Sequence, residues 1–239
     1  GTGIVPVHAD HRLLGLVDGW AAQVRTWQEA VSALRAAIEE QGVIAVINGI
    51  VGNDTHRRLN VEEFRGFALT DDLAPLIFVN GADAKSAQMF TLAHELAHLW
   101  LGAEGAGLSG FPGIFPDGGR VETFCDGAAA EFLVPAAELR ALWPQVAADA
   151  SPFESLAGAF KVSPIVIGRR AMDLGLTDRT PFFEFYDAYV QSERRQKSRG
   201  IGGGSFYNNQ NLRVGRLFAI QVMRAAKEGR IGFKDAYDL

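Results

Sequence analysis

The sequence has little of what marks a secreted or membrane protein. Its single cysteine, Cys125, excludes an internal disulfide and fits a reducing cytoplasm. No apolar run reaches the roughly 18 residues that a membrane helix needs, and the N-terminus lacks the basic region, apolar core and cleavage site of a signal peptide. The net charge of -5 argues against a chain built mainly to bind phosphate backbones. We therefore expect a cytoplasmic protein without a membrane segment.

Apolar spacing divides the chain into a few strands and many helices. The predicted strands cover residues 43–47, 64–69 and 75–81, and the predicted helices cover residues 23–41, 84–101, 120–134, 181–197 and 212–228. A further short helix is expected to end before Pro144, because proline lacks the backbone N–H that a helix interior requires. This order predicts an α+β fold, in which a small, mostly antiparallel sheet packs on a helical bundle and a helical portion follows at the C-terminus.

Residues 153–174 form a predicted pair of short helices that allows two interpretations. The pair could be a DNA-reading helix-turn-helix, or it could pack against the preceding helices. We favour packing, because its second helix offers only Arg169 and Arg170 for contacts with phosphates or bases. We therefore expect a domain over residues 1–180 that includes this pair, and a helical extension over 181–239 with a glycine-rich joint near 200–205.

The stretch FTLAHELAHLWLG, residues 90–102, places three ionisable side chains in an apolar helix. His94 and His98 are four residues apart, so they lie about 40° apart around the axis and about 6 Å apart along it, and both can bind one metal ion. Glu95 is rotated by about 100° from His94, which lets it face a water on that metal. This is the His-Glu-x-x-His pattern of zinc hydrolases. The alternative, a buried helix whose histidines satisfy nearby carbonyls, would be costly without a metal or tight pairing.

The stretch VETFCDGAAAEFLVP, residues 121–135, supplies candidates for a third zinc ligand. Glu122 and Asp126 share a helix face, so we assign Glu122 to Zn²⁺ and Asp126 to one histidine's distal nitrogen. The alternative is that Glu122 is an acid in a helix's first turn, where the dipole favours it. Ala129 continues this face and would allow close approach of the two helices. Cys125 lies near the same face and could hold the site latent as a zinc-bound thiolate, or it could be a small buried hydrophobe.

No single residue stands out as a donor to a developing oxyanion. The candidates are His56, Tyr186 and Tyr207. An extended substrate could add to an exposed edge of the small sheet, for which residues 64–69 are the best candidate.

These two stretches resemble the ImmA/IrrE-type metallopeptidases, which pair a His-Glu-x-x-His helix with a helix of the form E-x-x-[AC]-[ND]-x-x-A-x-x-[FL]-L-x-P. The resemblance runs from about Trp27 to Leu174, and more loosely to the end. It matches His94, His98 and Glu122 to the family's zinc ligands and Glu95 to its catalytic base, and it implies a zincin-like fold. Asp126 stands where the family often has Asn, which changes the surroundings of the ligands without placing a ligand in doubt.

The resemblance also implies a function. It suggests a zinc endopeptidase of narrow specificity that cleaves a helix-turn-helix repressor and so derepresses stress, phage or mobile-element genes. Longer members carry an N-terminal helix-turn-helix domain. The chain opens with GTG and lacks such a segment, so we expect that any DNA contact is made by a flanking domain outside it.

Two alternatives stay open at this point. One is a non-catalytic zinc-containing regulator that binds DNA or a repressor, although a purely structural site does not need Glu95. The other is a metal-dependent hydrolase that acts on something other than a peptide, because a zinc-water-glutamate centre does not itself select the carbonyl that it attacks.

Overall fold

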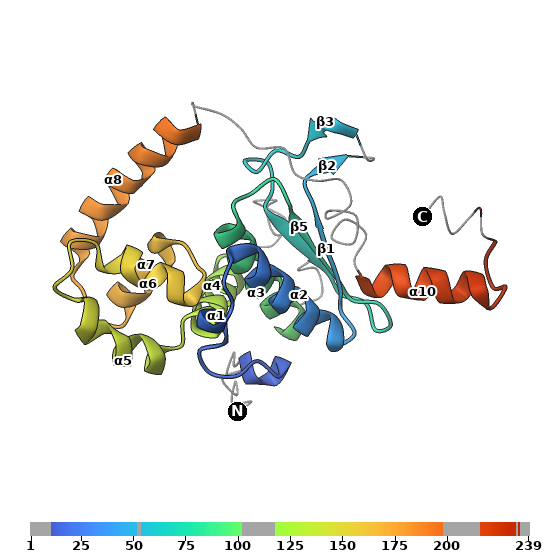
Figure 1. Ribbon diagram of the computed structural model, residues 1–239, viewed down its shortest axis with the longest axis horizontal. Coiled ribbons are helices and arrows are strands. Elements are labelled where there is room, and N and C mark those ends of the chain that lie inside the picture. The colour runs from blue at the N-terminus through green and yellow to red at the C-terminus, as the bar shows by residue number, and fades with distance from the viewer. Residues whose placement is uncertain (1–10, 52–53, 102–117, 198–215, 233, 235–239) are drawn as a thin grey trace.

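A computed structural model describes residues 11–51, 54–101, 118–197, 216–232 and 234 (Figure 1). In chain order its elements are η1 (His11–Leu14), α1 (Trp20–Gln23), α2 (Trp27–Glu40), β1 (Ile44–Asn48), β2 (Ile50–Val51), β3 (Asp54–Arg58), β4 (Gly66–Leu69), β5 (Leu76–Asn80), α3 (Lys85–Leu101), α4 (Gly118–Leu133), α5 (Ala136–Val146), α6 (Pro152–Phe160), α7 (Pro164–Asp173), α8 (Arg179–Lys197) and α10 (Arg216–Lys227). Every strand and helix that the sequence predicted appears, with bounds shifted by a few residues.

The main sheet has three strands in the order β1-β5-β4, and a separate two-stranded sheet pairs β2 with β3. β1 runs parallel to β5, whereas β4 is antiparallel to β5, with Gly66 opposite Val79. The main sheet is therefore mixed, and two of the three strand pairings in the described residues are antiparallel. The predicted α+β class, with a helical C-terminal portion, is confirmed.

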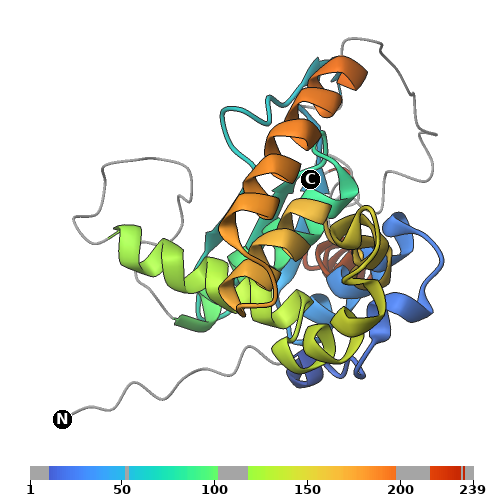
Figure 2. The same ribbon diagram turned by 90° about the vertical axis from the view of Figure 1, so that its left-hand side faces the viewer.

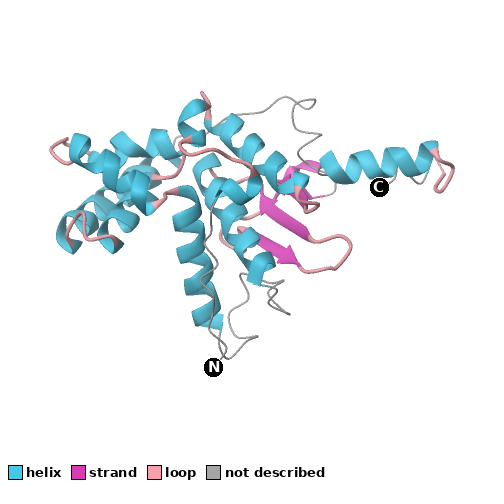
Figure 3. Cartoon of the chain, turned by 90° about the horizontal axis from the view of Figure 1, so that it is seen from below, coloured by secondary structure: helices cyan, strands magenta, loops and turns pink. Residues whose placement is uncertain are grey.

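Among the described helices, α2 and α3 cover one face of the main sheet. Strand residues that alternate along the chain, such as Ala45, Ala68 and Ile77, are fully buried against α2 and α3. On the other face Phe67 and Phe78 stack on each other with ring centroids 5.1 Å apart. Figure 3 shows most helices gathered on one side of the small sheet, with α10, which contacts β1, extending from the other side. This one-sided burial is why the strands alternate between apolar residues that face the core and half-exposed ones.

Two short-range features fix where the central helices start and how closely they pack. Thr26 begins α2 with a capping box, because its hydroxyl accepts from the Glu29 N–H while the Glu29 carboxylate accepts from the Thr26 N–H. α4 crosses α3 through small residues, of which Ala129 is fully buried and Ala97 is 3% exposed. Small side chains let the two helix axes approach closely, and this approach sets the spacing of the side chains between them.

The helical pair predicted over residues 153–174 is formed by α6 and α7, and it packs into the body of the protein. Ser163 caps α7 by accepting from the Val166 N–H. Arg170 of α7 forms an ion pair with Glu131 and donates to the Val134 carbonyl at 3.2 Å, so it is directed toward α4. α8 runs beside α7 (Figure 2). This arrangement agrees with the packing interpretation.

One boundary prediction was wrong, because Pro144 lies inside α5 instead of after it. The proline falls in the last turn, where it removes one backbone hydrogen bond near an end that frays in any case. Leu139 and Trp143 are buried on the same helix and hold it against the core.

The domain division at residue 180 stays a prediction, and the glycine-rich joint near 200–205 lies outside the described residues. Among the described helices, none combines the length and the apolar character that spanning a membrane would require.

Candidate metal centre

The metal-ligand candidates predicted from two separate helices meet between α3 and α4. The Nε2 atoms of His94 and His98 lie 3.0 Å apart. Glu122 of α4 places Oε2 at 3.1 Å from His94 Nε2 and Oε1 at 3.4 Å from His98 Nε2. His98 is 1% exposed and the His94 side chain 12% exposed, whereas the Glu122 side chain is 46% exposed and reaches in from the solvent side.

The donor set fits a tetrahedral metal ion. Zinc binds imidazole nitrogen at about 2.0–2.1 Å, so two ligand atoms of a tetrahedral site lie about 3.3 Å apart. The three separations of 3.0, 3.1 and 3.4 Å are close to that value. The Nδ1 atom of His98 is buried and has no hydrogen-bond partner among the described residues, so the contacts of this ring to His94 and Glu122 are made through Nε2. Two imidazoles and a carboxylate that converge in this way could hold a metal ion.

The surroundings of the two histidines shift their pKa values in opposite directions. Burial works to lower the pKa of His94, but the contact with Asp126 and the charges of Glu95 and Glu122 outweigh it, so that the pKa is raised. Burial and the neighbouring charge of His94 lower the pKa of His98. Without a metal, the pair therefore takes up its first proton on His94.

Asp126 lies where the sequence placed it, beside the distal nitrogen of a ligand. Its Oδ1 is 2.9 Å from His94 Nδ1, a short ion-pair distance. Its side chain is 62% exposed, so solvent screens part of this interaction. A carboxylate here can fix the ring orientation of a metal-ligating histidine and raise its basicity.

Glu95 is 2% exposed and lines the same cleft as His94 and Glu122. The cleft has a volume of about 550 Å³. The residues that line it are Val61, Glu62, Glu63, Phe64, Arg65, Gly66, Ser86, Ala87, Phe90, Thr91, His94, Glu95, Glu122, Asp126, Ser163, Ile165 and Val166. They come from the segment that leads into β4, from α3 and α4, and from the start of α7. The metal-ligand set is thus open to a substrate from one side.

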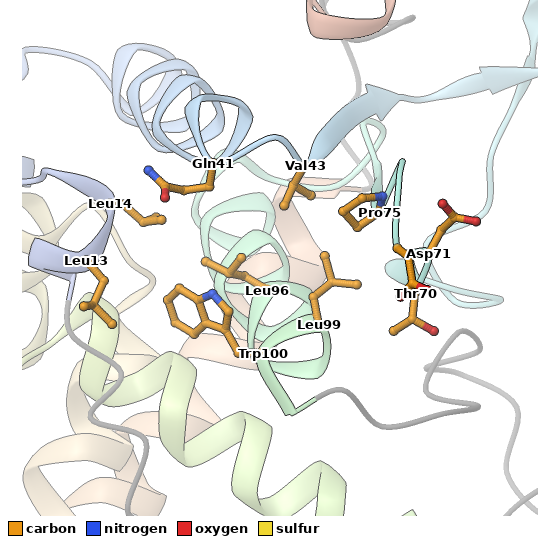
Figure 4. A pocket seen from close by; sticks show the side chains of 11 residues that line it. Leu13, Leu14, Gln41, Val43, Thr70, Asp71, Pro75, Leu96, Leu99 and Trp100 are labelled. Atoms are coloured by element: carbon orange, nitrogen blue, oxygen red, sulfur yellow. The ribbon is translucent and has the colours of Figure 1, made fainter.

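A larger cavity of about 920 Å³ lies behind the same helix (Figure 4). Leu96, Leu99 and Trp100 line it, and helical geometry places these three on the side of α3 opposite His94 and His98. Although it is the larger of the two cavities, it lies away from the metal-ligand candidates.

A second group of potential ligands, formed by His11, Asp18 and Glu138, is already engaged in holding the chain together. His11 Nε2 lies 3.2 Å from Asp18 Oδ1, and Arg12 lies 3.8 Å from the same carboxylate. Glu138 accepts from the Gly19 N–H at 3.3 Å, at the start of α1. These contacts account for the cluster without a metal.

A family model supplies the comparison that decides the class of this site. The model described as Peptidase M78, IrrE N-terminal-like domain, matches residues 51–172, just over half of the chain. The chain belongs to this metallopeptidase family. The match covers His94, Glu95, His98 and Glu122. No curated protein matches the chain.

The remaining predicted site residues of this M78 family member lie in different places. Cys125 is fully buried on α4, and burial, together with the charges of Glu122, Glu95 and Asp126, raises the pKa of its thiol to about 12. A free thiolate is therefore disfavoured, and the latency role stays a prediction that needs a metal to hold the sulfur.

None of the candidates for an oxyanion donor that lie within the described residues lines the cleft. His56 is exposed on β3, and Tyr186 is 40% exposed on α8, and neither lines the cleft. Tyr207 lies outside the described residues. All three assignments stay predictions.

Sequence reasoning missed two parts of the cleft. Gly66 of β4 lies against α3 beside Glu95, and the start of α7 contributes Ser163, Ile165 and Val166. The position of Gly66 in a predicted strand, between Arg65 and Phe67, gave a weak signal, because glycine inside a strand often marks a close approach. The contribution of α7 had no signal in the sequence.

Proposed function

We propose that the protein is a zinc-dependent endopeptidase of narrow specificity. The observation that carries this proposal is the convergence of His94, His98 and Glu122 at metal-ligand spacing, with the buried Glu95 lining the same open cleft. When bound by these three residues, zinc lowers the pKa of a bound water and polarises a substrate carbonyl. The family match supports peptide as the substrate.

Glu95 is the general base in this proposal. It takes a proton from the attacking water and returns that proton to the leaving amine, so it is unchanged at the end of the cycle. The low exposure of its carboxylate keeps bulk water from competing for the proton. Asp126 holds the His94 ring in orientation throughout.

The edge of β4 that pairs with no other described strand is the proposed binding surface for an extended substrate. β4 is last in the sheet order, and the Asn80 N–H donates to the Arg65 carbonyl at 2.7 Å. Because hydrogen-bonded pairs alternate along an antiparallel ladder, Gly66 and Ala68 direct their backbone N–H and C=O groups away from β5. A substrate strand can pair with these groups while its side chains meet the apolar walls of the cleft.

For the natural substrate we propose a helix-turn-helix repressor, whose cleavage derepresses stress, phage or mobile-element genes. The family resemblance supports this choice. A cleft of about 550 Å³ that receives an extended segment favours a protein with an accessible linker or a locally unfolded segment over a folded core.

The rival function, a non-catalytic regulator that reads DNA through α6 and α7, has weaker support. Arg169 pairs with Asp173 at 3.1 Å, and Arg170 is turned toward Glu131 and Val134. Both cations that would contact DNA are therefore engaged within the protein. DNA contact through a flanking domain stays an expectation.

The test is incubation of the zinc-loaded protein with the helix-turn-helix repressor encoded beside it, with fragments identified by mass spectrometry. Glu95→Gln is the inactive variant, and Glu184→Gln, which changes an exposed glutamate of α8, is the matched control. We expect the parent and the control to cleave the repressor and Glu95→Gln not to cleave it. Full cleavage by Glu95→Gln would refute the mechanism, and steep salt-dependent DNA binding without cleavage would favour the regulator.

A further inference from the structure

Gly66 is buried where β4 passes under α3, at the point where α3 carries Glu95. A Cβ atom at this position would lie 2.4 Å from Thr91 Cγ2, 2.8 Å from the Phe78 carbonyl oxygen and 3.3 Å from Glu95 Oε1. Contacts below 3.0 Å are not tolerated, and the Phe78 oxygen belongs to the neighbouring strand, so the sheet itself would have to move. The site therefore has no room for any residue larger than glycine.

Position 66 requires glycine because there is no space for a side chain, and not because of its backbone conformation. Among the described glycines, those with positive φ are Gly15, Gly19, Gly42, Gly175 and Gly229. Gly66 is not one of them, so its backbone is one that any residue can adopt. What an alanine would change is the distance between β4 and α3.

We propose that Gly66 is a positioning residue for Glu95. The missing side chain lets α3 lie directly on β4 and holds the Glu95 carboxylate against the strand, while Glu95's neighbours His94 and His98 face α4. The strand that offers its edge to the substrate thereby also fixes the general base relative to that edge. The catalytic consequence of this proposal rests on the proposed peptidase function, but the contact between Gly66 and Glu95 does not.

The proposal predicts that an added methyl group separates metal binding from turnover. The histidine ligands face α4, so the spacing of the donor set should survive a small shift of α3 away from β4. The distance from Glu95 to a substrate held on β4 should change. A misplacement of about 1 Å at a reacting group can cost about a hundredfold in rate.

Gly168 provides a matched control. A Cβ there would lie 2.7 Å from Phe182 Cδ2, so Gly168→Ala also crowds a packed interface, between α7 and α8, where no metal-ligand candidate lies. It tests whether loss of packing alone explains an effect. A second variant, Thr91→Ser, removes the atom nearest to the added methyl group and should restore space beside Gly66.

The first experiment uses metal-free protein and does not need activity. The urea midpoints of Gly66→Ala, Glu95→Ala and the double variant form a double-mutant cycle, and Gly168→Ala with Glu95→Ala forms the control cycle. We expect Gly66→Ala to be less destabilising when Glu95 is truncated, and the control cycle to be additive. An additive first cycle would overturn the proposal, whether or not the protein is a peptidase.

The second experiment uses the zinc-loaded full chain. We expect Gly66→Ala to bind one zinc with an affinity within about threefold of the parent and to lose at least about tenfold in kcat. Thr91→Ser, added to Gly66→Ala, should recover part of that loss. Gly168→Ala should keep its kcat. Equal loss in both glycine variants would reduce Gly66 to ordinary packing and refute the proposal. If the parent cleaves nothing, the proposed function fails and the first experiment still decides the role of Gly66.

Discussion

Asp126→Asn is the change that best separates two effects of one carboxylate on the metal centre. Asp126 lies 2.9 Å from His94 Nδ1, on the side of the ring away from the other ligands. In the proposed site it orients the ring, which favours metal binding, and its charge raises the pKa of His94, which favours a competing proton. Asparagine keeps the shape and removes the charge.

The size of the effect follows from exposure and from pH. Loss of such a partner costs about 10- to 100-fold in metal affinity, and we expect about tenfold because the Asp126 side chain is 62% exposed. Zinc needs His94 neutral, and in the parent the proton leaves only as the pH rises through a raised pKa. In the variant that pKa is lower, so the proton competes less at acidic pH. The difference in affinity should therefore be largest at about pH 8.5 and should shrink toward about pH 6.

The assay is competition for zinc with a chromophoric chelator at several pH values. Asp173→Asn serves as the control, because Asp173 is a half-exposed aspartate of α7 whose partner is Arg169. The control should match the parent throughout. Zinc affinity of Asp126→Asn within about twofold of the parent at about pH 8.5 would show that this carboxylate does not orient the ligand. A difference that grows as the pH falls would contradict the direction of the pKa shift.

Two further changes test the metal site and the helical pair. Zinc at about 1,000 times its Kd should raise the free energy of unfolding of the parent, measured in urea, by about 4 kcal/mol. His98→Ala should gain little stability from zinc. Equal stabilisation of both proteins would place the metal elsewhere. Arg170→Met should cost about 1 kcal/mol or somewhat more, because it removes an ion pair with the half-exposed Glu131 and a hydrogen bond to the Val134 carbonyl. Loss of DNA affinity without loss of stability in Arg170→Met would instead favour the DNA-reading interpretation.

The candidate ligand pair on α3 could be predicted because it depends on helix geometry alone. His94 and His98 share a face in any α-helix, and the long apolar run made the helix certain to form. Glu122 required one more step, since it lies 28 residues from His94. It could be selected because its own helix repeats the same four-residue spacing, with Asp126 one turn further on.

Features that depend on how separate elements meet could not be predicted in this way. Gly66 is one of 27 glycines in the sequence, and its role is visible only when β4 and α3 are seen in contact. The mixed direction of the strands is a similar case, because β1 and β5 are separated by the whole β2–β4 segment and only their pairing shows that they run parallel. Local spacing carries no information about either.

The helical pair shows how the same residues can support opposite functions until their surroundings are known. Arg170 was a candidate for a DNA contact because nothing in the sequence says which face of its helix is covered. Gly168, packed against Phe182, and Arg170, paired with Glu131, place α7 between α4 and α8. Once α7 is held there, its first turn forms a wall of the cleft through Ser163 and Val166. The segment that the sequence offered as a DNA reader thus helps to shape the space that a peptide substrate would enter.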